Sequence, residues 1–259
     1  MTKWIGTCCI CGRHGPLSFE HVPPRAAYNN HRVLEADVKR IIRGGWQALK
    51  NPKGKYNQRG AGRHTLCGQC NNDTGAWYGS DYVDWVRQGM RLLGASGGRV
   101  TLSYPYEIYP LRVIKQIATM FFSACGPGFH EKHPELVRFV LNKEMLQVPE
   151  RIRFYTFFQD PNKSTGSRQS GVSGVLNLER ARPHVFSEIV FPPYGFIMML
   201  DTPPIDQRLC DITHFGEFAH RTRSIRHLRL PVLPIVSWLP ADFRDEEEIE
   251  QALASSSDR

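Results

Sequence analysis

The sequence predicts an α+β protein built from two units, a small one over residues 1–94 and a larger one over residues 95–259. Three observations support this: two Cys-x-x-Cys couplets near the start, helical spacing of apolar residues in several segments, and strand-like runs after residue 151. The chain has 259 residues, of which 41% are hydrophobic. It is therefore long and apolar enough to form an ordered protein with a sizeable core.

The two couplets, Cys8 with Cys11 and Cys67 with Cys70, supply four thiolates. Four thiolates match the tetrahedral coordination of a structural Zn²⁺ ion, and a small unit with little core gains stability from such an ion. Gly12 follows the first couplet, which predicts a tight turn over residues 7–12. We therefore expect a zinc ion held by all four cysteines. The other three, Cys9, Cys125 and Cys210, are expected to be buried thiols.

The remaining elements of the first unit follow from local patterns. Residues 17–22 are typical of a short strand that ends at two prolines, so Glu20 and His21 lie at the strand end and face opposite sides. Residues 32–49 show near-helical spacing interrupted by two glycines, and residues 51–62 are typical of an exposed loop. Residues 71–74 are expected to cap a helix that ends near Leu93. The glycine-rich segment after it marks the boundary between the units.

The second unit is predicted to combine helices with a mainly antiparallel sheet. The helices are expected at residues 110–125, 134–143 and 242–254, and the strands at 152–157, 172–178, 185–191, 196–200 and 228–238. We expect this unit to serve recognition, regulation, or contact with a second copy of the chain or a partner protein. The sequence does not choose among these roles.

Composition indicates a cytoplasmic protein with a polyanionic partner. No run of about 18 apolar residues is present, so no membrane span is expected, and the first residues lack the apolar stretch of a signal peptide. The net charge is +8. Between His21 and Cys67, ten Lys and Arg residues stand against two acidic residues, a surplus that equals the charge of the whole chain. This segment favours contact with the phosphates of nucleic acid.

Polar residues follow each couplet, and one zinc ion would bring them together. Glu20 and His21 lie about nine residues after the first couplet, and Asn71 follows the second directly. A carboxylate and an amide oxygen suit Mg²⁺ or Mn²⁺, and a neutral imidazole can accept a proton from water. These residues predict a site for phosphodiester hydrolysis with one catalytic metal ion.

The order of these motifs resembles that of HNH (ββα-metal) nucleases, in the variant with Asn at the last position. The resemblance covers residues 5–93 and rests on the couplets, on Glu20-His21-Val22-x-Pro24 and on Asn71-Asn72-x-Thr74-Gly75. It implies a zinc-clamped ββα-metal module acting as an endonuclease, more on double-stranded DNA than on RNA, in a phage, a mobile element or an anti-phage system. It implies His21 as general base, with Glu20, in place of the usual Asp, and Asn71 as ligands of the catalytic ion.

The resemblance is incomplete before the second couplet, where the family usually has a middle Asn. Gly62, Arg63 and His64 occupy this region. His64 is our candidate for a supporting role, orienting His21 or reaching the phosphate, and a loop histidine in contact with solvent is the alternative. Phosphate contact is expected from the basic residues Arg25, Arg63, Arg59, Lys55 and Lys53. Two other functions remain open: a non-catalytic zinc-dependent module that binds nucleic acid, and a degenerate nuclease that acts as an interaction protein.

Overall fold

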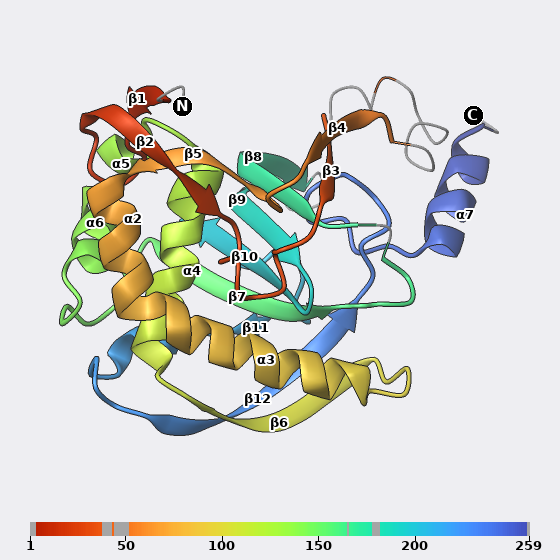
Figure 1. The fold of residues 1–259 in the computed structure, drawn as a ribbon. Coiled ribbons are helices and arrows are strands. Elements are labelled where there is room, and N and C mark those ends of the chain that lie inside the picture. Colours follow the sequence, from red (N-terminus) through yellow and green to blue (C-terminus); the bar gives the residue numbers. More distant parts are fainter. Residues whose placement is uncertain (1–3, 38–42, 44–51, 165, 178–181, 258–259) are drawn as a thin grey trace.

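The computed structural model describes residues 4–37, 43, 52–164, 166–177 and 182–257 (Figure 1). It confirms the α+β class and the mainly antiparallel sheet. Helix α4 (Pro110–Cys125) runs through the middle of the molecule, with the first part of the chain on one side and a large sheet on the other. Thirteen of its residues are buried, which is why its sequence is apolar on nearly every face.

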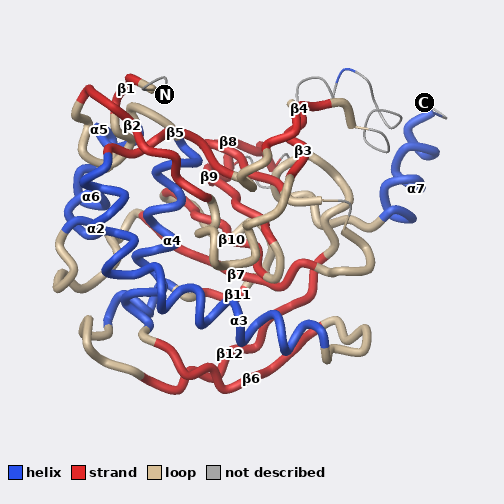
Figure 2. Tube along the Cα trace, in the orientation of Figure 1, coloured by secondary structure: helices blue, strands red, loops and turns tan. Residues whose placement is uncertain are grey.

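The first part of the chain forms a three-stranded antiparallel sheet followed by one long helical segment. The strand order is β1 (Ile5–Thr7), β2 (His14–His21) and β5 (Gly62–Cys67). The helical segment comprises α2 (Gly68–Thr74), the short π-helix η1 (Gly75–Gly79) and α3 (Ser80–Gly94), and Figure 2 shows it as a continuous run of helix. It ends at the glycine-rich segment, as predicted.

Three predictions for this part were wrong. The helix begins at Gly68, so Asn71 lies inside its first turn and does not cap it. Strands β3 (Val33–Ala36) and β4 (Gly54–Asn57) pair with each other where we expected near-helical and loop structure. A four-residue strand is too short for periodicity to identify. A Cβ atom at Gly54 would overlap the Glu35 carbonyl, so this glycine permits the close pairing. The rest of the near-helical prediction lies mostly outside the described residues.

The second part forms a seven-stranded sheet in the order β6-β12-β7-β10-β9-β8, with β11 also paired to β7. Among the described strands, only the pairing of β12 with β7 is parallel. The strands are β6 (Thr101–Ile108), β7 (Ile152–Gln159), β8 (Arg168–Asn177), β9 (Arg182–Phe191), β10 (Tyr194–Leu200), β11 (Cys210–Asp211) and β12 (Ser224–Leu233). The sequence pattern had located five of them and missed β6 and β11.

The other helices of this part are short and lie around the sheet. They are α5 (Phe129–Lys132), α6 (Pro134–Leu141), the 3-10 helix η2 (Thr213–Glu217) and α7 (Glu246–Ser257). Both α6 and α7 lie within or close to their predicted ranges. In the described part of the chain, no helix is both long and apolar enough to cross a membrane.

One hydrophobic core joins the two parts of the chain. Buried residues from the first couplet, from α3, from α4 and from the large sheet belong to the same cluster. Trp85 of α3 is fully buried and stacks on Tyr194 of β10, with ring centroids 4.4 Å apart. One turn later, the Tyr194 ring occupies the space that a Cβ atom at Gly89 would need. Helix α3 therefore rests directly on the sheet, while the boundary at residue 94 stays a prediction.

Candidate functional site

The four cysteines of the two couplets form a cluster that can hold a metal ion such as zinc. Their sulfur atoms all lie within 4.8 Å of one another, and the Sγ atoms of Cys11 and Cys67 are 3.8 Å apart. A tetrahedral ion with Zn–S bonds of ~2.3 Å would set its sulfur ligands about 3.8 Å apart. Cys8 and Cys70 share a hydrogen bond that lowers the pKa of the Cys8 thiol, so one of the pair is readily present as the thiolate that zinc binds.

The backbone around the cluster forms the predicted turn. The Gly12 amide donates to the Cys8 carbonyl at 3.0 Å, and Gly12 has a φ of 71°, a left-handed conformation that suits glycine. The exposed Arg13 donates from Nε to Cys11 Sγ at 3.4 Å. The adjacent Cys9 is buried, as predicted, whereas Cys125 and Cys210 are only partly buried because they lie at the end of α4 and in the short strand β11. Burial raises the pKa of both these thiols to about 11.

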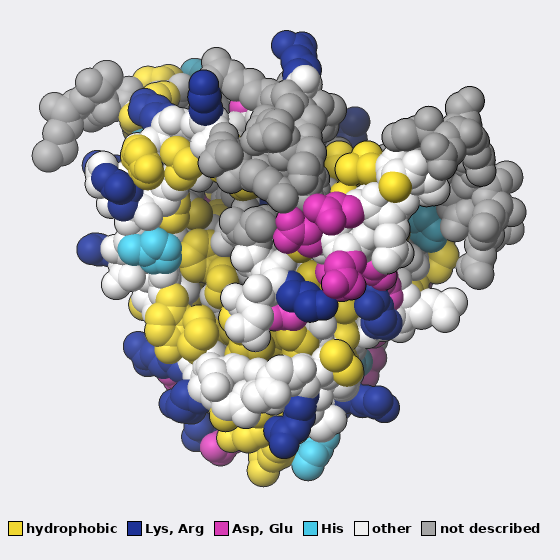
Figure 3. Space-filling model, turned by 90° about the vertical axis from the view of Figure 1, so that its right-hand side faces the viewer, with side chains coloured by type: hydrophobic (Ala, Val, Ile, Leu, Met, Phe, Trp, Pro, Cys, Tyr) yellow, Lys and Arg dark blue, Asp and Glu magenta, His cyan; other side chains and the backbone are white. Residues whose placement is uncertain are grey.

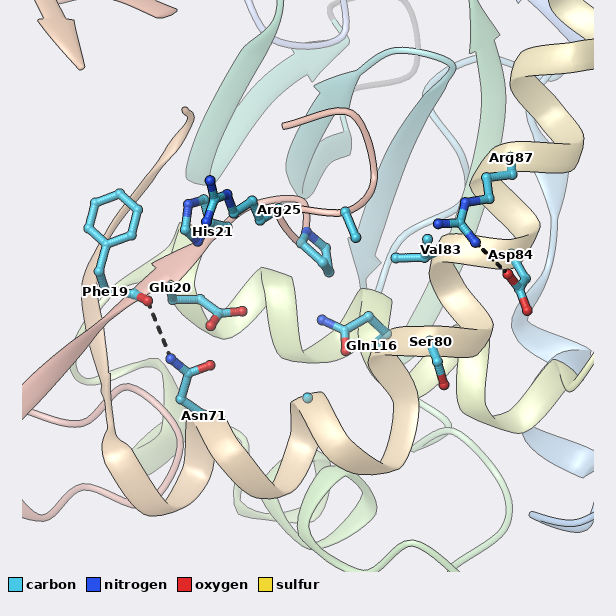
Figure 4. A pocket seen from close by; sticks show the side chains of 14 residues that line it. Phe19, Glu20, His21, Arg25, Asn71, Ser80, Val83, Asp84, Arg87 and Gln116 are labelled. Carbon is cyan, nitrogen blue, oxygen red and sulfur yellow. Dashed lines mark hydrogen bonds and ion pairs between the residues drawn. The ribbon is translucent and has the colours of Figure 1, made fainter. Parts of the chain in front are cut away.

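A cavity of about 450 Å³ lies beside the cluster, where β2 ends against the helical segment. Glu20, His21 and Asn71 all line it, and Figure 4 shows the Glu20 carboxylate and the Asn71 amide pointing into the same space. The other lining residues are Phe19, Pro24, Arg25, Ala26, Gly75, Gly79, Ser80, Val83, Asp84, Arg87 and Gln116. The structure therefore brings together the three residues that the sequence places after its couplets.

The His21 ring is held by a backbone carbonyl. Its Nε2 atom lies 3.0 Å from the Arg59 carbonyl oxygen. A carbonyl only accepts, so Nε2 carries the proton in this contact and the lone pair of neutral His21 lies on Nδ1. Burial, together with the cations Arg25 and Arg59, lowers the pKa of His21. The ring is thus neutral near pH 7, with Nδ1 available as a base.

Glu20 is 7% exposed and lines the cavity. Within the described part of the chain no cation or hydrogen-bond donor contacts it, and burial raises its pKa to about 8. A buried carboxylate without a counterion is costly, and a divalent cation would offset this cost. The donor set thus fits a cation that prefers oxygen ligands.

The orientation of Asn71 leaves its oxygen for the cavity. Its Nδ2 atom donates to the hydroxyl of Ser18 at 3.0 Å and to the carbonyl of Phe19 at 3.3 Å. Because a carbonyl cannot donate, these contacts identify the nitrogen side of the amide. The Oδ1 atom is left pointing toward the space below Glu20 (Figure 4).

His64 does not line this cavity. It stacks on Trp4, with ring centroids 4.9 Å apart, and makes an edge contact with Phe19. Phe19 in turn contacts His21, with centroids 4.8 Å apart. Any influence of His64 on His21 therefore passes through the Phe19 ring. Two residues before His64, a Cβ atom on Gly62 would overlap the Glu20 carbonyl, so no larger residue fits there.

The predicted phosphate-binding residues are all exposed, but they lie in different places. Arg25 lines the cavity, whereas Arg63 lines a second cavity of about 870 Å³ beside β8 and β9. Lys53 and Lys55 lie at the start of β4, and Arg59 lies in the loop before β5. On the face drawn in Figure 3, Lys and Arg side chains are interleaved with acidic and hydrophobic ones.

Two polar residues near the cavity escaped the sequence analysis. Asn29 is fully buried and bonds the backbone at both ends of the loop between β2 and β5. Gln116 reaches the cavity from α4, far away in the sequence. A polar residue inside the apolar run 110–125 is the one sequence signal that points to Gln116. Nothing in the sequence separates Asn29 from its neighbour Asn30.

Comparison of the chain with protein-family models, with curated proteins and with solved structures found no match.

Proposed function

We propose that this protein is a metal-dependent endonuclease of the HNH type, which hydrolyses phosphodiester bonds in nucleic acid. The observation that carries the proposal is the convergence of a carboxylate, a neutral imidazole and an amide oxygen on one cavity. They come from the end of one strand and the first turn of the following helix, next to a four-cysteine cluster. The order of the motifs along the chain supports the same function.

His21 is the proposed general base. With Nε2 bonded to the Arg59 carbonyl, Nδ1 takes the proton of the attacking water. The backbone carbonyl thereby performs the orienting task for which the sequence offers no middle Asn. His64 has a supporting role at most, through its contact with Phe19.

Glu20 and Asn71 are the proposed ligands of a catalytic Mg²⁺ or Mn²⁺ ion. One carboxylate and one amide oxygen leave room on such an ion for water and phosphate oxygens. Bound there, the ion would act as a Lewis acid and stabilise the charge that develops on the phosphate. Glu20 supplies the negative charge that attracts the cation, and the two hydrogen bonds from Asn71 keep its oxygen in place.

The proposed substrate is double-stranded DNA in preference to RNA. Arg25 at the cavity is placed to contact the scissile phosphate, and Arg59, Arg63, Lys53 and Lys55 are exposed for contacts along the backbone. The proposed zinc ion in the cysteine cluster is structural, because four thiolates leave it no open position for substrate.

Cleavage of plasmid DNA by the purified chain, with Mg²⁺ or Mn²⁺ and with EDTA, tests the proposal. We expect cutting with either metal, none with EDTA, and a loss of about 10²–10⁴-fold in rate for His21→Ala, since a general base contributes that much. His227→Ala, which removes an exposed histidine from β12, is the matched control and should cut like the parent. RNA in place of plasmid tests the substrate class.

The pH profile adds a second test of His21. The base is active when neutral. At a Mg²⁺ concentration high enough to keep Glu20, whose pKa burial raises to about 8, ionised on the cation, the rate should fall on acidification through the pKa of His21 and be constant above it. Because burial lowers this pKa, the acid limb should lie below pH 6.5. If neither metal supports cutting, or if His21→Ala cuts as fast as the parent, the proposal fails. DNA binding that needs neither Mg²⁺ nor Mn²⁺ and leads to no cutting would favour a zinc-dependent binding module.

A further inference from the structure

A row of aromatic rings lies on the three-stranded sheet and ends at His21. Trp4 stacks on His64, with ring centroids 4.9 Å apart and planes inclined by 16°. His64 makes an edge contact with Phe19, with centroids 5.3 Å apart, and Phe19 makes another with His21 at 4.8 Å. Because each ring contacts the next, the four form one surface that leads to the proposed general base.

The backbone fixes the place of each ring. The strand register pairs Phe19 of β2 with His64 of β5, so the two rings lie on the same face of the sheet. Phe19 and His21 also share a face, since side chains two residues apart in a strand point the same way, and Figure 4 shows both rings on the same side of that strand. Trp4 precedes β1, but its carbonyl accepts a hydrogen bond from a β2 amide at 2.8 Å. The row is therefore anchored from end to end.

The outer end of the row is exposed to solvent. Trp4 is 61% exposed and its neighbour Ile5 is 58% exposed, whereas the other three rings are partly buried. A single exposed apolar side chain is common on protein surfaces, but a contiguous apolar patch indicates an interaction surface. A partner with flat apolar groups would fit this one.

The charge around the row favours a polyanionic partner. Residues 4–21 and 59–69, which contain the row, include three arginines and one acidic residue, Glu20, which is buried. The exposed Arg59 places its guanidinium over the Phe19 ring, 5.4 Å from the centroid. Single-stranded nucleic acid offers both flat bases and phosphates, and proteins bind it through aromatic rings and nearby arginines. In a duplex the faces of the bases are covered by their neighbours, so only unpaired bases can stack on protein rings.

We propose that Trp4, His64 and Phe19 form a stacking surface for unpaired bases of the nucleic-acid strand that is cut. The inference rests on the proposed function, which places the scissile phosphate beside His21. It narrows the substrate to duplex DNA with a single-stranded segment next to the cut. Bases of that segment stack on the rings, and Arg59 contacts a phosphate of the same strand. This role of His64 lies in binding and is separate from any support of His21.

Fluorescence anisotropy of labelled oligothymidylate with the zinc-loaded chain, without added Mg²⁺ or Mn²⁺, tests the surface. Oligothymidylate forms no base pairs, so its bases are free to stack. We expect Trp4→Ala to weaken binding by at least about fivefold, the lower end of what one stacked base contributes, and Trp4→Phe to retain most of the affinity. Tyr104→Ala removes an exposed aromatic residue of β6 and is the matched control, which should bind like the parent. Equal affinity of Trp4→Ala and the parent would overturn the inference.

Tryptophan emission provides a second measurement, which does not depend on the stability of Trp4→Ala. Trp4→Phe keeps an aromatic ring against His64 and is compared with the parent. A stacked base quenches the emission of an indole ring, so saturating oligothymidylate should quench the parent more strongly than Trp4→Phe. Equal quenching of the two proteins would refute the stacking surface.

Cleavage with Mg²⁺ separates this inference from the proposed function. The parent should cut a duplex with a single-stranded gap faster than the same duplex fully paired, and Trp4→Ala should cut both at the slower rate. If the parent cuts both duplexes equally fast, the proposed function stands and the substrate preference is refuted. If the parent cuts neither, the proposed function and the substrate preference both fail, while oligothymidylate binding that depends on Trp4 would still support the stacking surface.

Discussion

Asn29 holds together the two ends of the loop that connects the strands of the candidate site. Its Nδ2 atom donates to the carbonyls of Pro23 and Ala61, both at 2.7 Å, and its Oδ1 accepts from the Ala61 amide at 2.7 Å. These bonds fix the chain directly after His21 and shortly after Arg59, whose carbonyl holds the His21 ring. The orientation of the proposed base therefore depends on a residue that does not touch it.

Asn29→Asp should destabilise the protein and slow cleavage. The change keeps the size and one acceptor, but it removes both donors and places a carboxyl group next to two buried carbonyls. Each unsatisfied group costs about 1–3 kcal/mol, so we expect the free energy of unfolding in urea to fall by roughly 2–4 kcal/mol. Asn30→Asp makes the same change at the exposed neighbouring residue and should change the free energy of unfolding by less than about 0.5 kcal/mol. Equal stability of the two variants would contradict this account.

The sequence allowed us to predict those site residues whose positions depend on nearby residues in the chain. Glu20, His21 and Asn71 could be named because each follows a cysteine couplet at short range, and they line one cavity. Asn29 and Gln116 could not, because their roles depend on contacts with the far end of a loop and with a distant helix. Whether His64 supports His21 stays a prediction.

Elements were predictable where the hydrophobic period persists over many residues. The predicted helix 110–125 has the bounds of α4, and its length of sixteen residues gives the helical period several turns to emerge. The strand Thr101–Ile108 was missed because its exposed residues and Pro105 weaken the alternation. Strands β3 and β4 stabilise each other by pairing, which no local pattern records.

Removal of one couplet cysteine should abolish metal binding by the cluster. We expect Cys67→Ser to lose the zinc that the parent carries, at about one ion per chain, because three thiolates bind zinc far more weakly than four. Strand β5 and helix α2 meet at Cys67. We therefore expect the variant to have a lower melting temperature than the parent and to lose the sheet β1-β2-β5. Zinc content is measured by atomic emission on the purified protein.

Cys9→Ala is the matched control for this prediction. Cys9 is buried in the same turn but does not belong to the cluster, so this variant should retain its zinc. Retention of about one zinc per chain by Cys67→Ser would refute the four-thiolate site.

At the scale of the whole molecule, the charge balance predicts salt-sensitive binding of nucleic acid. The logarithm of the binding constant falls by about 0.9 per phosphate contact for each unit in the logarithm of salt concentration. Five contacts, from Arg25, Arg59, Arg63, Lys53 and Lys55, should give a slope of about −4.5. Replacing both Lys53 and Lys55 by alanine should reduce the magnitude of the slope by about 2.

Fluorescence anisotropy of labelled duplex DNA with the zinc-loaded chain, without added Mg²⁺ or Mn²⁺ to prevent cutting, measures this slope. Arg221 is an exposed cation in the turn before β12. Arg221→Ala is the control and should leave the slope unchanged. An affinity that does not depend on salt would show that the segment between His21 and Cys67 does not contact phosphate.

The contact between Gly89 and Tyr194 limits how this protein can be reassembled. Here the wall of the cavity, α3, lies on an aromatic ring of the large sheet that leaves no room for even one methyl group. A chimera that joins the first 94 residues to another protein would have to provide an aromatic ring in the position of Tyr194. Without it, a large apolar helix face would be exposed to solvent.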